Sequence, residues 1–149
     1  MTLPLPPAFA ALLAVALSGG HGLAGERIDG PVLADVVEVI DGDTVRVSAR
    51  IWPGQRVEVA VRLRGVDAPE MRGRCAAERR LARAARAALG RRLGAAPVRL
   101  VNIGGGKYYG RVLAEVMLAD GTDLGQWLLA NAPVRPYAGG RRERWCADR

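Results

Sequence analysis

Histidine, serine and lysine are scarce in this chain of 149 residues. With so few histidines and serines, the sequence argues against a histidine-based zinc site or a histidine general base, and a serine triad is nearly excluded. The few residues of these three types are His21, Ser18, Ser48 and Lys107.

Positive charge is therefore carried almost entirely by arginine. The chain holds 22 basic and 15 acidic residues, with a net charge of +7 and a pI near 10.6. Guanidinium groups bind phosphates and carboxylates through paired hydrogen bonds, so the expected partner is an acidic polymer such as nucleic acid. The length suits a single domain.

The N-terminal segment is typical of a secretory signal. Residues 9–17, FAALLAVAL, are apolar but too few to span a membrane, and small residues follow them. Cleavage after Ala24 would release a secreted or periplasmic chain with no membrane attachment. No Lys or Arg precedes the apolar run, so an uncleaved anchor or a misassigned start stays open.

Two cysteines, Cys75 and Cys146, stand 71 residues apart, and no C-x-x-C spacing is present. In an exported chain a disulfide between them is expected, with two independent free thiols as the alternative.

The hydrophobic pattern predicts an α+β fold, a five-stranded OB-type β-barrel. A main helix lies between its third and fourth strands, and a short second helix follows the fifth. Strands are expected at residues 36–40, 44–51, 57–63, 98–101 and 111–118, and helices at 75–93 and 123–131. Alternation predicts that Val45, Val47 and the odd-numbered residues of 57–63 are buried. Ala77 is expected to begin the apolar side of the first helix, and Asp123 to cap the second. The expected segments are a signal at 1–24, an N-terminal extension at 25–35, the barrel domain at 36–137 and a basic tail at 138–149.

Four carboxylates occur in two short stretches, each at the end of a predicted strand. Asp41 and Asp43 lie in DGDT, and Asp67 and Glu70 lie in VDAPE. Either stretch alone is more typical of a turn or a helix cap. If the barrel brings both together, four converging carboxylates need a cation, and oxygen ligands favour calcium or magnesium.

Two arginines strengthen this interpretation. Arg62 lies five residues before Asp67, and Arg111 begins another predicted strand. Carboxylates and guanidinium groups together suit phosphodiester cleavage, because a cation and arginines neutralise the charge that develops on the phosphoryl oxygens. A carboxylate beside the phosphorus can orient and deprotonate water.

Five stretches follow one another in order over residues 36–137: VIDGDTVRV at 39–47, RLRGVDAPE at 62–70, C-x-x-E at 75–78, YGRVLA at 109–114 and ADG at 119–121. Together they resemble the staphylococcal nuclease (thermonuclease) family. The resemblance implies a calcium-dependent endo- and exonuclease that acts on DNA and RNA and leaves 3′-phosphate ends.

The resemblance also implies roles for single residues. Asp43, Asp67 and the main-chain carbonyl of Ala68 would bind calcium, with Asp41 as an outer contributor. The preference for calcium over magnesium rests on the resemblance.

The remaining roles concern the phosphate and the nucleotide. Glu70 would be the general base or the residue that orders the nucleophilic water. Arg62 and Arg111 would hold the phosphate, and Tyr137 would stack on the nucleotide. Lys107 departs from the family, which usually has aspartate there. The alternative is a catalytically silent barrel that binds nucleic acid or protein.

Overall fold

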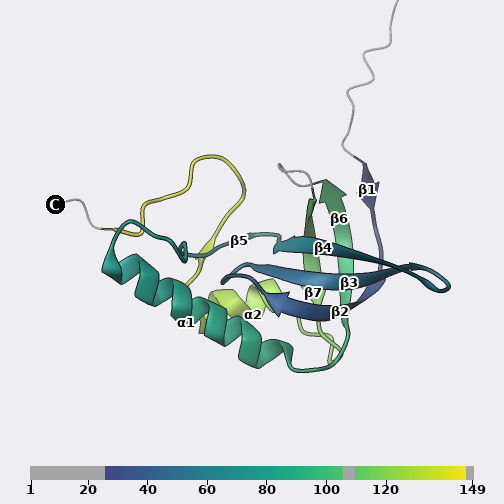
Figure 1. The fold of residues 1–149 in the computed structure, drawn as a ribbon. Coiled ribbons are helices and arrows are strands. Elements are labelled where there is room, and N and C mark those ends of the chain that lie inside the picture. The colour runs from purple at the N-terminus through teal and green to yellow at the C-terminus, as the bar shows by residue number, and fades with distance from the viewer. Residues whose placement is uncertain (1–25, 106–109, 147–149) are drawn as a thin grey trace, which may run out of the picture.

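A computed structural model describes residues 26–105 and 110–146 of this protein, so the expected signal at 1–24 and Lys107 lie outside the described residues. Five strands close into a barrel in the order β6-β2-β3-β4-β7, and β7 pairs again with β6 (Figure 1). This confirms the predicted OB-type barrel. The strands are β2 (Val32–Val39), β3 (Thr44–Trp52), β4 (Gln55–Leu63), β6 (Val98–Gly105) and β7 (Arg111–Met117).

The segment before residue 36 forms strand rather than only an extension. Strand β2 begins at Val32, four residues earlier than predicted, and pairs there with β6. A two-residue strand, β1 (Arg27–Ile28), also pairs with β6. Backbone pairing explains the difference, because the weak alternation in this stretch does not reveal that β6 lies beside it.

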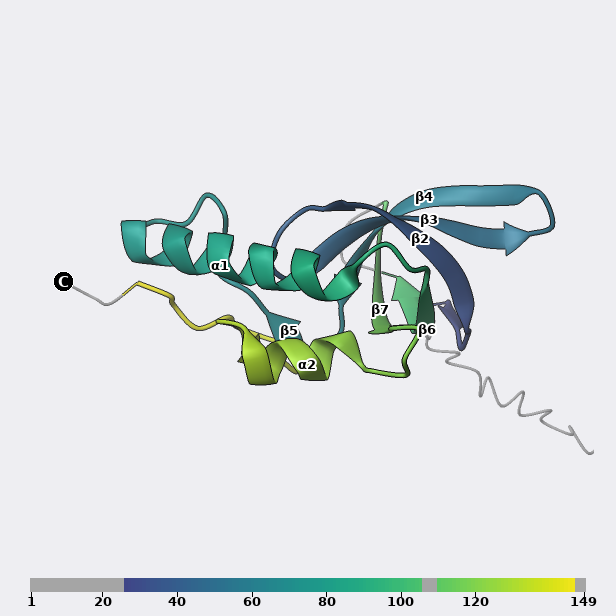
Figure 2. The ribbon, with the colours of Figure 1, turned by 90° about the horizontal axis from the view of Figure 1, so that it is seen from below.

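The barrel interior is filled by apolar residues, including those that the alternation predicted. Val45, Val47 and Val61 are fully buried, and Leu63 is almost so. The expected burial of Val57 is wrong, since its side chain is 44% exposed. Strands β3 and β4 continue as a hairpin beyond the barrel, so the start of β4 has no opposite wall to pack against (Figures 1 and 2).

Helix α1 (Ala76–Leu93) follows the short strand β5 (Val66–Asp67), and it lies along helix α2 (Leu124–Asn131) (Figure 2). The side chain of Asp123 caps α2 by accepting a hydrogen bond from the Gln126 amide at 3.1 Å, as the sequence predicted. Near its start, the buried side of α1 is shifted by one residue from the predicted side, because Ala77 is exposed and Glu78 is buried.

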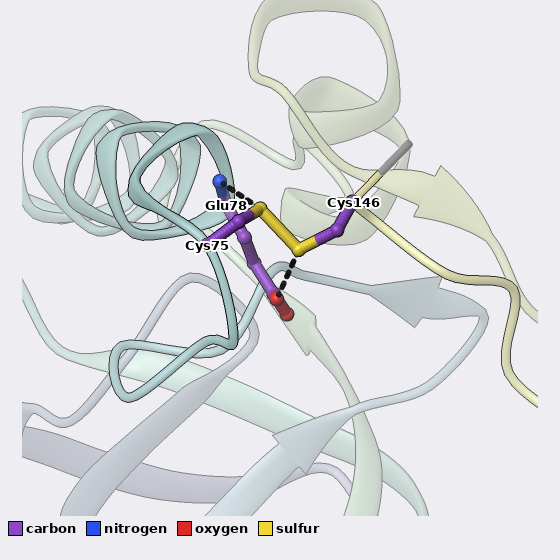
Figure 3. A group of neighbouring side chains, drawn as sticks. All are labelled: Cys75, Glu78 and Cys146. Atoms are coloured by element: carbon purple, nitrogen blue, oxygen red, sulfur yellow. Dashed lines mark hydrogen bonds between the residues drawn. A yellow bond between two sulfur atoms is a disulfide. The ribbon is translucent and has the colours of Figure 1, made fainter. Parts of the chain in front are cut away.

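The end of the chain folds back toward the start of α1. Strand β8 (Arg135–Pro136) pairs with β5, and the following residues run to the first turn of the helix (Figure 1). There Cys75 and Cys146 form the predicted disulfide, with Cα atoms 6.0 Å apart (Figure 3). Within the described residues, no helix is both long enough and apolar enough to span a membrane.

Candidate active site

Strand register places the two predicted phosphate-binding arginines on one face of the sheet. Arg111 lies opposite Ala60 in the parallel pairing of β4 with β7, and Arg62 is two residues further along β4. Side chains two residues apart on a strand point to the same face. Both arginines therefore lie on the side of β4 away from the buried valines.

The turn between β2 and β3 fixes the carboxylate of Asp43. Its Oδ1 accepts a hydrogen bond from the Thr44 hydroxyl at 2.8 Å, and its Oδ2 accepts one from the Ala68 amide at 2.9 Å. The Asp43 amide donates to Asp41 Oδ1 at 3.1 Å, so Asp41 closes the turn. The Ala68 bond draws the DGDT and VDAPE stretches together, 25 residues apart in sequence.

Arg62 lies between the two aspartates. Its Nη1 is 2.6 Å from Asp43 Oδ2, and its Nη2 is 3.6 Å from Asp67 Oδ1. Nη2 also donates to the carbonyl of Val66 at 3.0 Å. Both aspartates are almost fully buried, whereas the arginine side chain keeps 19% of its surface exposed. The guanidinium therefore balances two desolvated negative charges while one side stays accessible.

A cavity of about 810 Å³ opens over this cluster. Asp67 lies behind it, bonded to arginines that line it. Most residues predicted from the sequence contribute to its wall: Asp41, Asp43, Arg62, Ala68, Glu70, Arg111 and Tyr137.

Tyr137 borders the cavity through contacts that fix its position. Its amide donates to the carbonyl of Gly65 at 3.0 Å, and its hydroxyl donates to the carbonyl of Gly140 at 2.7 Å. The ring lies 5.9 Å from the Arg62 guanidinium carbon, within the range of a cation–π contact. The ring is thus held beside a predicted phosphate-binding group.

Arg142, which lies in the segment predicted only as a basic tail, also reaches this site. The guanidinium of Arg142 donates to Asp67 Oδ1 and Glu70 Oε1, and its Nη2 donates to the Ala68 carbonyl at 2.9 Å. Partial burial disfavours the charged form, but the bonds to Glu70 and the charge of Asp67 outweigh it and raise the pKa of Arg142. Its neighbours in sequence gave no sign of this contact.

Glu78, the acidic residue of the C-x-x-E stretch, has a role that was not predicted from the sequence. Its Oε1 accepts from the Glu70 amide at 3.3 Å, and its Oε2 accepts from the Arg74 amide at 3.0 Å. The C-x-x-E spacing places it one turn into α1, beside Cys146 (Figure 3). The buried carboxylate therefore holds the loop that carries Glu70.

The carboxyl group of Asp41 has a pKa well above its ordinary value. Burial raises its pKa to about 6, and repulsion from the neighbouring charge of Asp43 adds to the increase. The paired aspartates thus resist carrying two negative charges when no cation other than the arginines is near.

The donor atoms around Asp67 fit a hard cation. Asp43, Asp67 and the Ala68 carbonyl offer only oxygen, and Asp67 and Ala68 already converge on a single guanidinium. Oxygen ligands of this kind suit calcium and magnesium.

A second group of ligand atoms, from Cys75, Glu78 and Cys146, lies within 4.8 Å of one another. Both sulfur atoms are joined in the disulfide and offer no thiolate to a metal. This group therefore joins the chain end to α1 and is not a metal site.

A small OB-type barrel that gathers arginines and carboxylates around one cavity at its rim has the character of a phosphodiester-processing protein. The family model for staphylococcal nuclease homologues matches residues 60–137, more than half of the chain. The chain therefore belongs to the staphylococcal nuclease homologue family, a family of nucleases. Comparison with curated proteins gave no significant match.

Proposed function

We propose that this protein is a secreted, calcium-dependent nuclease that hydrolyses phosphodiester bonds of DNA or RNA and leaves 3′-phosphate ends. The observation that supports it most strongly is the position of Arg62, whose guanidinium contacts Asp43 and Asp67 and borders the cavity that Glu70 and Arg111 also line. Groups for binding a phosphate, holding a cation and activating water thus lie around a single space.

The arginines would bind the scissile phosphate. Arg62 and Arg111 lie on the same face of β4 and β7, so both can direct N–H groups toward one phosphoryl group. Rigid guanidinium forks stabilise the negative charge that grows on these oxygens during attack.

Glu70 would act on the water that attacks phosphorus. Its side chain is about half exposed, so water reaches it directly. In the proposed step Glu70 accepts a proton from water, the water oxygen bonds to phosphorus, and the bond from phosphorus to the 5′ oxygen breaks. The leaving 5′ oxygen takes up a proton from solvent water, so the products are a 3′-phosphate and a 5′-hydroxyl.

Asp43, Asp67 and the Ala68 carbonyl would hold the calcium ion, and Asp41 would support Asp43 through their turn. When bound, the ion would neutralise part of the charge on the phosphoryl group. The buried setting of both aspartates favours this role, because their charges are poorly screened by solvent.

Digestion of plasmid DNA by the protein from residue 25 onward, with calcium or with a chelator, tests this proposal. We expect cleavage with calcium only, and intact plasmid under both conditions would instead support the silent binding barrel. Glu70→Gln should retain binding to a short oligonucleotide and lose at least about 10²-fold in turnover. Glu58→Gln, on the exposed part of β4, is the matched control and should cleave normally.

Secretion or periplasmic export is part of the same proposal. It rests on the apolar N-terminal segment and agrees with the disulfide, since disulfides persist in oxidising compartments. Fractionation of the source cells, with detection of the chain and mass measurement of its N-terminus, tests it.

A further inference from the structure

Arg142 occupies the position that the proposed function assigns to a cation. Its guanidinium contacts Asp67, Glu70 and the Ala68 carbonyl, each through a different nitrogen. Two of these three acceptors are proposed calcium ligands, and the third is the proposed general base. One side chain from the C-terminal segment thus engages both functions of the site.

We propose that Arg142 is a built-in competitor of the metal, and that a divalent cation binds at Asp67 and Ala68 only when this guanidinium is displaced. The inference rests on the proposed function, which supplies the cation site. Arg142 therefore sets how readily the site binds metal and how readily Glu70 can contact water.

Steric and electrostatic reasons make the two states exclusive. Calcium lies about 2.3–2.6 Å from its oxygen ligands. Arg142 Nη2 is 2.9 Å from the Ala68 carbonyl, and Nε is bonded to Asp67, so the guanidinium fills that space. Two cations this close would also repel each other strongly in a partly buried site.

The fold keeps Arg142 near the acidic groups without fixing its side chain. On one side, the Tyr137 hydroxyl bonds the carbonyl of Gly140. On the other, the disulfide ties Cys146 to Cys75 at the start of α1. Between these anchors the local concentration of the guanidinium is high. Its side chain is 37% exposed, so it can rotate into solvent without unfolding the segment.

Displacement would also change Glu70. While Arg142 is bonded to Glu70 Oε1, a charged donor occupies that oxygen and takes the place of a hydrogen bond from water. Binding of the cation would release Arg142 from both carboxylates at once. Metal binding and exposure of the base are therefore coupled through one residue.

The test is calorimetric titration of calcium, without nucleic acid, into the wild-type protein, Arg142→Ala and Arg141→Ala. Arg141 is an exposed neighbour, so replacing it removes the same charge as replacing Arg142. Among the described residues no hydrogen bond or ion pair links Arg141 to Asp67 or Glu70. If the guanidinium is bound in nine molecules of ten, its removal tightens calcium binding about tenfold. Arg141→Ala should change the affinity less than about twofold, because an exposed charge is screened.

The direction of the change separates competition from a structural role, since loss of a structural support would weaken calcium binding. Arg142→Gln serves as a second variant, and we expect it to bind calcium as tightly as Arg142→Ala. If both variants bind calcium no more tightly than the wild-type protein, the proposed role of Arg142 is overturned. Absence of calcium binding in every protein, wild type included, would instead overturn the proposed cation site.

Discussion

Arg62 Nη1 lies 2.6 Å from Asp43 Oδ2, so strand β4 is joined to the turn between β2 and β3 by an ion pair whose carboxylate is only 3% exposed. The same arginine reaches Asp67 on β5. A group proposed to bind phosphate is therefore also the counter-ion of two buried aspartates.

Arg62→Ala should reduce both turnover and stability. We expect turnover to fall by about 10² or more, because the guanidinium is proposed to stabilise charge in the transition state. Stability should fall by roughly 3 kcal/mol, since buried Asp43 loses its guanidinium partner and Asp67 keeps only Arg142. Plasmid digestion and urea unfolding in chelator measure the two effects.

Arg46→Ala is the matched control for that experiment. Arg46 lies on β3 and pairs with Glu38 at the surface, where both side chains are about half exposed. Exposed pairs contribute about 0–1 kcal/mol, so stability and cleavage should change little. Equal losses in the two variants would contradict the special position of Arg62.

The raised pKa of Asp41 predicts a pH dependence of stability in metal-free protein. Its folded pKa of about 6 exceeds the ordinary value of 3.8, so between these values the folded protein binds more protons than the unfolded chain. The free energy of unfolding should therefore fall as pH rises through this window. Urea unfolding in chelator at several pH values measures it.

Asp41→Asn removes the titrating group and should flatten that part of the profile. The variant should also be more stable than wild type above pH 6, because the repulsion between residues 41 and 43 is gone. Identical slopes for the two proteins would show that another group dominates.

The disulfide predicts a large change in stability on replacement of both cysteines by serine. Its removal frees a loop of 71 residues and should cost roughly 4 kcal/mol in the chain-entropy model. Urea unfolding with and without reductant measures the change. Reductant should destabilise the wild type and leave the Cys75→Ser, Cys146→Ser protein unaffected, whereas insensitivity of the wild type would refute the bond.

Glu78→Ala should destabilise the loop that carries Glu70. The amides of Glu70 and Arg74 lose their acceptor, which should cost roughly 1–3 kcal/mol. Thermal unfolding measures the loss, and turnover should fall with it because Glu70 is less well positioned. Glu58→Ala, on the exposed part of β4, is the control and should match the wild type in both measurements.

Periodicity made the fold predictable. Alternation in β3 and β4 and the three-to-four spacing in α1 are local patterns, and each identifies a buried face from neighbours in the sequence. The errors arose where long-range pairing decides the outcome. Residues 32–34 are strand because β6 lies beside them, and Val57 is exposed because its hairpin leaves the barrel.

The sequence alone determined which groups this protein has available. Acids in DGDT and VDAPE, an arginine on each of two strands and a nearly histidine-free composition restrict its chemistry, because side-chain type fixes charge and ligand preference. Only the tertiary structure decided which groups meet. Arg142 and Asp67 are 75 residues apart, and they meet because the β5–β8 pairing and the disulfide return the chain end to the barrel. No local pattern encodes such a contact, since its free energy depends on the whole fold around it.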